Sequence, residues 1–254
     1  MTRPAVGGPG PGGADAGDAR IRLRGETLEL LPERVLWWPA QGTLLVADAH
    51  FGKAASFRAH GVPVPRGTTT ESLERLSSAV CRKNAQVAVF LGDFLHSAKG
   101  RADATLERLH AWRRRHAGLE MLLVRGNHDD RAGDPPPSLG LRVVDEPYRM
   151  GPFALCHLPD GLQQDVGREG NADGDGDGEL RLTAQEPAPY VLCGHLHPAW
   201  RVSGRRESLR LPCFWFSRRH AVLPAFGAFT GGHVIERRAA DRVFVVAEDR
   251  VIKV

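Results

Sequence analysis

Val87-Ala88-Val89-Phe90-Leu91-Gly92-Asp93 is an apolar run that stops abruptly at a carboxylate. Its first five residues carry no polar side chain and have the length of a β-strand, so the pattern predicts a strand that is buried on both faces. Asp93 stands just past the end of this strand. Ligands in open α/β sheets bind outside the carboxyl ends of the strands. We therefore expect Asp93 to lie at a binding site.

The same arrangement recurs at four other places along the chain. In each of them a short apolar run leads to residues that can bind metals: 43–47 to Asp48 and His50, 121–124 to Gly126-Asn127-His128, 154–156 to His157, and 191–193 to Gly194-His195-Leu196-His197. Five strands that end at one edge would bring these side chains together. Carboxylate, amide and imidazole donors in such a mixture predict a metal site.

The predicted ligands are too numerous for one metal ion. They are Asp48, His50, Asp93, Asn127, His157, His195 and His197. Two divalent ions about 3.5–4 Å apart would use the whole set, with Asp93 as the shared carboxylate. The donor types suit Mn²⁺, Fe or Zn²⁺ better than Ca²⁺. Each residue taken alone has an ordinary explanation, such as a turn aspartate or a surface histidine. The prediction depends on five coincidences in one context.

Composition sets the broad class of the protein. The chain has 254 residues, of which 42% are hydrophobic and 25% charged, values that are ordinary for a globular protein with a sizeable core. No apolar run approaches the roughly 18–20 residues that cross a bilayer. Four scattered cysteines without a CxxC pair indicate reduced thiols. We expect a cytoplasmic protein without a membrane segment.

Charge is distributed unevenly along the chain. The net charge is +4, but residues 194–254 hold 11 Lys and Arg against 5 Asp and Glu, and residues 165–187 hold 7 acids against 2 Arg. A basic C-terminal third suits a polyanionic substrate such as nucleic acid. A solvated basic surface is the plainer explanation, and charge alone does not choose between them.

The predicted elements describe an α/β half followed by a β-rich half. Helices are expected at 68–84 and 102–116, with Thr68 and Glu71 at the spacing of a capping box, and residues 52–60 are expected to form a short helix or an ordered loop. From Tyr190 onward, short strands are separated by turn signals. Residues 1–18 are Gly/Pro-rich and expected to be disordered, and 19–254 form one domain. The Gly/Asp-rich insert at 163–187 is interpreted as a flexible loop, because an EF-hand would need Glu where Ala184 stands.

The five motifs, taken in order, resemble those of the calcineurin-like metallophosphoesterase superfamily. The resemblance implies an α/β fold, a four-layer αββα sandwich. It also implies that one metal is held by Asp48, His50, Asp93 and His197, and the other by Asp93, Asn127, His157 and His195. The two cations would activate a bridging hydroxide for in-line attack on phosphorus. His128 would stabilise charge or protonate the leaving group.

The rest of the chain resembles one subgroup of that superfamily. Asp48-Ala49-His50-Phe51-Gly52-Lys53, Gly92-Asp93-Phe94-Leu95-His96-Ser97 and the segments 210–216 and 222–232 are similar to the bacterial ligase-associated DNA damage response endonucleases, the PdeM family. This resemblance implies a manganese-dependent DNA endonuclease that is associated with an ATP-dependent DNA ligase and an Lhr-type helicase. His96 stands where several superfamily members carry a carboxylate that orients the catalytic histidine, so His96 is expected to contact substrate instead.

Aromatic and cationic residues follow His197 closely in the sequence. Stacking side chains interleaved with cations suit single-stranded DNA. The expected substrate contacts are Trp200, Arg201, Arg218 and Arg219, with Lys53, His96 and Arg131 as further candidates. Two alternatives stay open: a phosphodiesterase or phosphatase for nucleotides and small molecules, and a non-catalytic scaffold in a ligase–helicase complex. The sequence is also compatible with a homodimer.

Overall fold

The computed structural model describes residues 17–64, 67–96, 103–126, 129, 133–159, 188–204 and 207–254. Three residues that were predicted to take part in the site, Asn127, His128 and Arg131, lie outside this part of the chain, as do residues 1–16 and the acidic insert. The division into a disordered extension and one domain stays a prediction. No helix in the described ranges combines the length and the apolar character needed to cross a membrane.

The first sheet has seven strands that follow one another in sequence order. Neighbouring strands pair antiparallel from the first to the fourth, and parallel from the fourth to the seventh. Its strands are β1 (Ala19–Leu23), β2 (Glu26–Leu31), β3 (Val35–Trp38), β4 (Thr43–Ala47), β5 (Val87–Leu91), β6 (Glu120–Val124) and β7 (Leu141–Val144). The predicted strands at 43–47 and 87–91 are confirmed to the residue.

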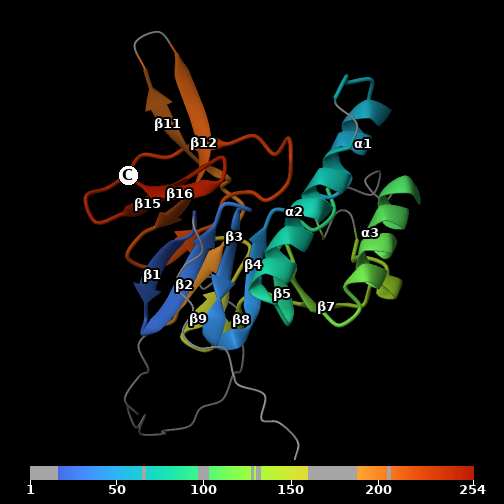
Figure 1. Cartoon of the computed structure of the whole chain (residues 1–254), viewed down its shortest axis with the longest axis horizontal. Coiled ribbons are helices and arrows are strands. Elements are labelled where there is room, and N and C mark those ends of the chain that lie inside the picture. Colours follow the sequence, from blue (N-terminus) through green and yellow to red (C-terminus); the bar gives the residue numbers. More distant parts are fainter. Residues whose placement is uncertain are drawn as a thin grey trace, which may run out of the picture.

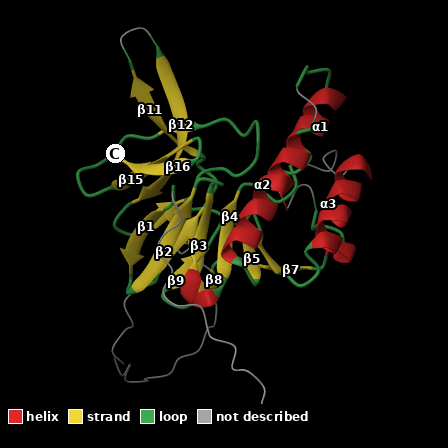
Figure 2. Cartoon of the chain, in the orientation of Figure 1, coloured by secondary structure: helices red, strands yellow, loops and turns green. Residues whose placement is uncertain are grey.

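The three described helices lie on one side of this sheet, and the last two of them pack on its face, as Figures 1 and 2 show. They are α1 (Lys53–Ala59), α2 (Thr68–Lys83) and α3 (Asp103–Arg115), and two short 3₁₀ turns lie at η1 (Pro39–Gln41) and η3 (Pro137–Leu139). The predicted capping box is wrong. Gly67, with a φ of 97°, takes the N-cap position without a side-chain hydrogen bond, and Thr68 is already a buried helical residue.

The second sheet contains nine strands. They are β8 (Tyr148–Met150), β9 (Phe153–Leu155), β10 (Tyr190–Cys193), β11 (Pro198–Ser203), β12 (Ser208–Phe216), β13 (His220–Val222), β14 (His233–Val234), β15 (Arg242–Ala247) and β16 (Arg250–Lys253). Strand β10 lies parallel to both β9 and β13. The β11–β12 hairpin extends away from the body of the molecule (Figure 1).

Alternate residues of the central strands pack into two different hydrophobic cores. On β4, Leu44 and Val46 belong to the cluster beneath the helices, whereas Leu45 and Ala47 belong to the cluster shared by the two sheets. A strand buried on both faces needs apolar residues throughout, which explains the continuous run that the sequence shows. The two-sheet α/β fold agrees with the expected sandwich. The described residues alone do not show a fourth, helical layer.

Candidate metal centre

Six of the seven predicted ligands lie in the described part of the chain, and all six lie at one edge of the sandwich. They are Asp48 and His50 after β4, Asp93 after β5, His157 after β9, and His195 and His197 after β10. The parallel register aligns Ala47 with Leu91, so Asp48 and Asp93 emerge side by side. A bridge between Ala47 and Ala225 joins the two sheets at the same edge.

The backbone turns sharply where the ligands leave their strands. Five of the six have a positive φ: Asp48 51°, His50 44°, Asp93 51°, His195 70° and His197 46°. The left-handed conformation costs a non-glycine residue roughly 1 kcal/mol or more, and such strain gathers at functional sites. Loop hydrogen bonds hold the turns in place, for example His50 N to Asp93 O at 2.8 Å. The fold therefore constrains these side chains at some cost in stability.

Two glycines allow the strand ends to approach each other closely. A Cβ at Gly92, in the first sheet, would lie 2.2 Å from Nδ1 of His157 in the second. A Cβ at Gly194 would lie 2.5 Å from Oδ2 of Asp48. Real Cβ atoms do not come that close, so both positions exclude any larger residue. The Gly-Asp and Gly-His motifs thus reflect contact between the two sheets.

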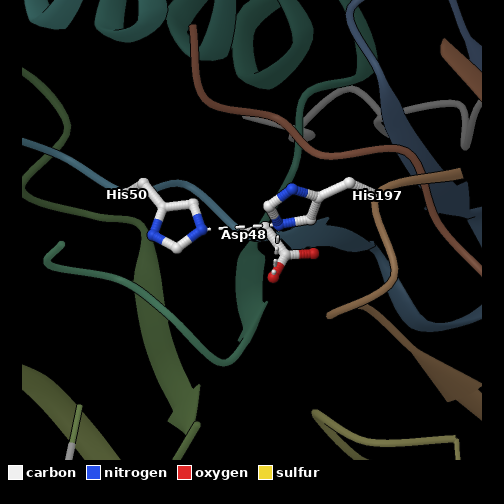
Figure 3. Close-up of side chains that lie close together, drawn as sticks. All are labelled: Asp48, His50 and His197. Atoms are coloured by element: carbon white, nitrogen blue, oxygen red, sulfur yellow. Dashed lines mark hydrogen bonds and ion pairs between the residues drawn. The ribbon is translucent and has the colours of Figure 1, made fainter. Parts of the chain in front are cut away.

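The first group of ligands consists of Asp48, His50 and His197 (Figure 3). Nε2 of His50 lies 3.4 Å from Nε2 of His197, and the latter atom lies 3.4 Å from Oδ1 of Asp48. Two donors bound to one tetrahedral ion at the usual lengths are separated by about 3.3–3.4 Å. Asp48 Oδ1 is buried and accepts no hydrogen bond from the described residues. A bound cation would offset the cost of burying this charged oxygen without a hydrogen bond, so the group fits a metal ion.

The second group contains Asp48, Asp93 and His157. Oδ1 of Asp93 lies 3.5 Å from Nε2 of His157, and Oδ2 of Asp93 lies 3.5 Å from Nε2 of His50. The two oxygens of this carboxylate therefore face histidines of different groups. His195 Nδ1 lies 3.0 Å from His157 Nε2, which adds a further donor. The cluster suits the binding of divalent metal ions.

Backbone carbonyls orient two of the imidazoles. Nδ1 of His197 donates to the Thr230 carbonyl at 3.0 Å, and Nδ1 of His157 donates to the Leu91 carbonyl at 3.1 Å. With Nδ1 protonated, Nε2 of each ring carries the lone pair that can bind a metal, which is the usual arrangement around metals. The sequence did not indicate these partners, because each is a carbonyl distant along the chain.

Burial and charge act on the histidines in opposite directions. Burial, followed by the neighbouring His157, lowers the pKa of His195 and favours the neutral ring that a metal needs. Burial also opposes charge on His197, but the nearby Asp48 carboxylate outweighs it and raises the pKa of His197. Metal binding would displace any proton held between His197 and Asp48.

Two carboxylates that were not predicted as ligands fix the ligand loops. Oε2 of Glu146 accepts the backbone N–H groups of His157 and Leu158. Asp129 accepts those of Phe94 and Gly126, both at 3.0 Å, and so ties the loop after β6 to the loop after β5. Burial raises the pKa of Asp129 to about 6, although its backbone hydrogen bonds oppose the shift. Nothing in the local sequence distinguishes these acids from ordinary turn residues.

The predicted substrate contacts separate into two sets. Lys53 begins α1 beside the centre, and burial lowers its pKa while Asp93 and Asp48 oppose that shift. The His96 ring lies 5.4 Å from the His50 ring. These two residues are close enough to reach a phosphate at the centre.

The other described candidates lie farther from the ligands. Trp200 is half-buried and packs against a cluster in the second sheet, and Arg201 is exposed on β11. Arg218 and Arg219 precede β13, which runs parallel to β10 toward the metal edge. Both arginines therefore lie at the opposite end of the sheet. Their position argues against direct contact with a phosphate at the centre. The sequence did not reveal this, because the direction of β13 follows from its pairing with β10.

The fold and the cluster of acids and imidazoles define a metal-dependent phosphoesterase. Among solved structures, the nuclease MPE of Pseudomonas putida is 38% identical to this chain, with a TM-score of 0.74; the match covers 93% of this chain and 100% of the nuclease. The chain belongs to the calcineurin-like metallophosphoesterase superfamily and resembles its PdeM family, as the motifs predicted.

A second solved structure is more distant. The phosphoesterase Yfce from E. coli is 16% identical with a TM-score of 0.36, over 84% of this chain and 97% of that protein. No protein-family model matches the chain, and neither does any curated protein.

Proposed function

We propose that this protein is a dinuclear-metal phosphodiesterase that cleaves DNA, preferentially single-stranded DNA, in bacterial DNA repair. The observation that carries the proposal is the position of Asp93, whose two oxygens face His50 on one side and His157 on the other. A carboxylate in this position can bridge two cations. The similarity to a protein described as a nuclease supports the choice of nucleic acid as substrate.

The ligands divide between two ions in this proposal. Asp48, His50, Asp93 and His197 would hold one, and Asp93, Asn127, His157 and His195 would hold the other. Bound divalent ions would neutralise the phosphoryl oxygens and lower the pKa of water for attack on phosphorus. Mn²⁺ is our choice for the bound metal, with Fe and Zn²⁺ as alternatives, because the donors are imidazole and oxygen without thiolate.

The remaining residues act on the substrate. His128 stabilises the developing charge or protonates the leaving oxygen. Lys53 and His96 contact the phosphate from the α1 side, and Arg131 contributes a further cation. His96 replaces the carboxylate found in several relatives, so His128 works without an orienting acid at that position.

The projecting hairpin supports a polymeric substrate. The hairpin begins just beyond His197, and its strands β11 and β12 carry Arg201 and Arg210, both exposed. Val202 and Leu209 are also exposed, at 45% and 58%. Cations with nearby apolar side chains suit a strand whose phosphates and bases are contacted in turn. The proposal places the enzyme in the cytoplasm, in association with an ATP-dependent ligase and an Lhr-type helicase.

A manganese-supplemented digest tests the proposal directly. Circular single-stranded DNA, duplex DNA and cyclic nucleotides are compared, and we expect the circular single strand to be cut fastest and cleavage to weaken steeply with salt. Efficient hydrolysis of cyclic nucleotides with flat salt dependence would favour the nucleotide phosphodiesterase. No turnover of bis-p-nitrophenyl phosphate would favour the scaffold.

His128→Ala tests the catalytic assignment. We expect a loss of about 10²-fold or more in kcat with metal content unchanged, because the residue acts on the leaving group and is no ligand. Retained activity would remove His128 from the catalytic set.

A further inference from the structure

A small cavity lies directly beside the metal centre. It has a volume of about 220 Å³, and its lining includes Arg34, His197, Arg210, Pro212, Ala225 and Thr230. Sites for drug-sized ligands occupy about 300–1,000 Å³, so this cavity suits only a fragment such as one phosphate group. Because His197 belongs to both the cavity and the metal centre, a group bound here would be next to the reacting phosphate.

Arg34 reaches this cavity from the turn between β2 and β3. Strand β3 is antiparallel to β4, so the turn lies at the same edge as Asp48. Arg34 has a φ of 65°, and its N–H donates to the Leu31 carbonyl at 3.0 Å. A bulky residue in the left-handed conformation is unusual. The strained turn therefore places a cationic side chain at the metal edge.

No carboxylate among the described residues pairs with the Arg34 guanidinium. Its neighbour in sequence, Glu33, pairs with Arg82 at 2.7 Å instead. Burial lowers the pKa of Arg34. A partly buried cation without a counter-ion is costly, and an anionic ligand would remove that cost.

A second arginine increases the positive charge behind the cavity. Arg75 donates to the Phe226 carbonyl, and its guanidinium lies 4.5 Å from the centre of the Phe226 ring. Burial, followed by the nearby charge of Arg34, lowers the pKa of Arg75 to about 10. Arg75 holds the segment that lines the cavity, because Phe226 follows Ala225. Arg210 completes the arrangement from β12, where it faces Arg201 across the strand pair.

We propose that Arg34 and Arg210 form a subsite for the phosphodiester group next to the scissile one in a nucleic acid strand. The proposal rests on the proposed function, because a nucleic acid strand offers a second phosphate beside the scissile one. The subsite would favour oligonucleotides over small diesters that carry a single phosphate. Its role is to bind and position the substrate strand.

Binding of a labelled oligonucleotide tests the subsite. Fluorescence anisotropy is measured on manganese-loaded protein with a phosphorothioate-linked single strand that resists hydrolysis. Arg34→Gln and Arg210→Gln should each weaken binding about tenfold. Each should also reduce the slope of log affinity against log salt by about 1. Arg22→Gln is the matched control, because Arg22 is exposed on β1 and away from the cavity.

Kinetics separate the subsite from the metal centre. With bis-p-nitrophenyl phosphate, both variants should match the wild-type protein, whereas with an oligonucleotide KM should rise about tenfold and kcat change little. Replacing one neighbouring linkage by an uncharged methylphosphonate should slow the wild-type enzyme and leave Arg34→Gln unaffected. Arg210→Gln keeps the test valid if Arg34→Gln folds poorly, since Arg210 is exposed.

The outcomes distinguish this inference from the proposed function. If the protein cuts DNA and both variants bind and cut like Arg22→Gln, the subsite is wrong and the nuclease assignment stands. If the protein hydrolyses bis-p-nitrophenyl phosphate but neither binds nor cuts DNA, both fail together. Equal loss of activity on both substrates would show damage to the metal centre and would also overturn the subsite.

Discussion

The first sheet supplies both carboxylates of the candidate centre, whereas the second sheet supplies three of its four described imidazoles. Asp48 and Asp93 are nearly inaccessible, with exposures of 0% and 2%, while His195 and His197 are partly exposed. The acids therefore form the floor of the site, and two of the imidazoles from the second sheet face solvent. Neither sheet holds a complete ligand group alone, so the function depends on how the two sheets meet.

The largest effect is expected from removing the shared charge of the first sheet. Asp93→Asn preserves the size of the side chain but removes the charge that faces both His50 and His157. We expect activity on bis-p-nitrophenyl phosphate to fall by about 10³-fold or more, because metal ions contribute several kcal/mol to such reactions. Metal content is measured in parallel by mass spectrometry. Full activity with a normal metal content would contradict the shared role of Asp93.

A smaller but structural effect is expected where the two sheets touch. In Gly92→Ala the new methyl group would overlap the His157 ring, so the sheets must separate locally. We expect the free energy of unfolding to fall by about 1–3 kcal/mol, with weaker metal binding, measured by urea denaturation and metal titration. Gly118→Ala is the control, since no described atom of another segment lies within 4 Å of the position that its methyl group would take. Equal behaviour of the two variants would mean that this contact does not matter.

The smallest effect is expected at the support of one ligand in the second sheet. Glu146→Ala removes the acceptor that holds the backbone of His157 and Leu158. Metal affinity should fall about tenfold, as is usual for residues that support a ligand from behind. Glu146→Gln keeps an acceptor and should lose less, and Glu120→Ala, an exposed residue, should lose nothing. If the metal affinity of Glu146→Ala is unchanged, other contacts must hold the backbone of His157 and Leu158 in place.

The sequence predicted the strands, and the sheet edge at which the ligands lie, more fully than the residues that surround and support those ligands. Continuous apolar runs located β4 and β5, because a strand that is covered on both faces buries every side chain and so consists mainly of apolar residues. The six described ligands lie together because parallel strands end at a common edge. Their roles, and those of Asn127 and His128, stay predictions.

What could not be predicted depends on contacts between distant segments. Glu146 and Asp129 act through backbone N–H groups that no local pattern reveals. Arg34 is unusual only because Glu33 pairs elsewhere and the turn lies beside His197. The direction of β13, which places Arg218 and Arg219 away from the centre, likewise follows from strand pairing. Pairing of this kind is a property of the fold as a whole.

The central claim is that two sheets together hold a pair of metal ions. Diffraction from manganese-soaked crystals, recorded at the manganese absorption edge, tests it most directly. We predict two anomalous peaks about 3.5–4 Å apart, with Asp93 between them. One peak, or none at the histidines of the second sheet, would contradict the account.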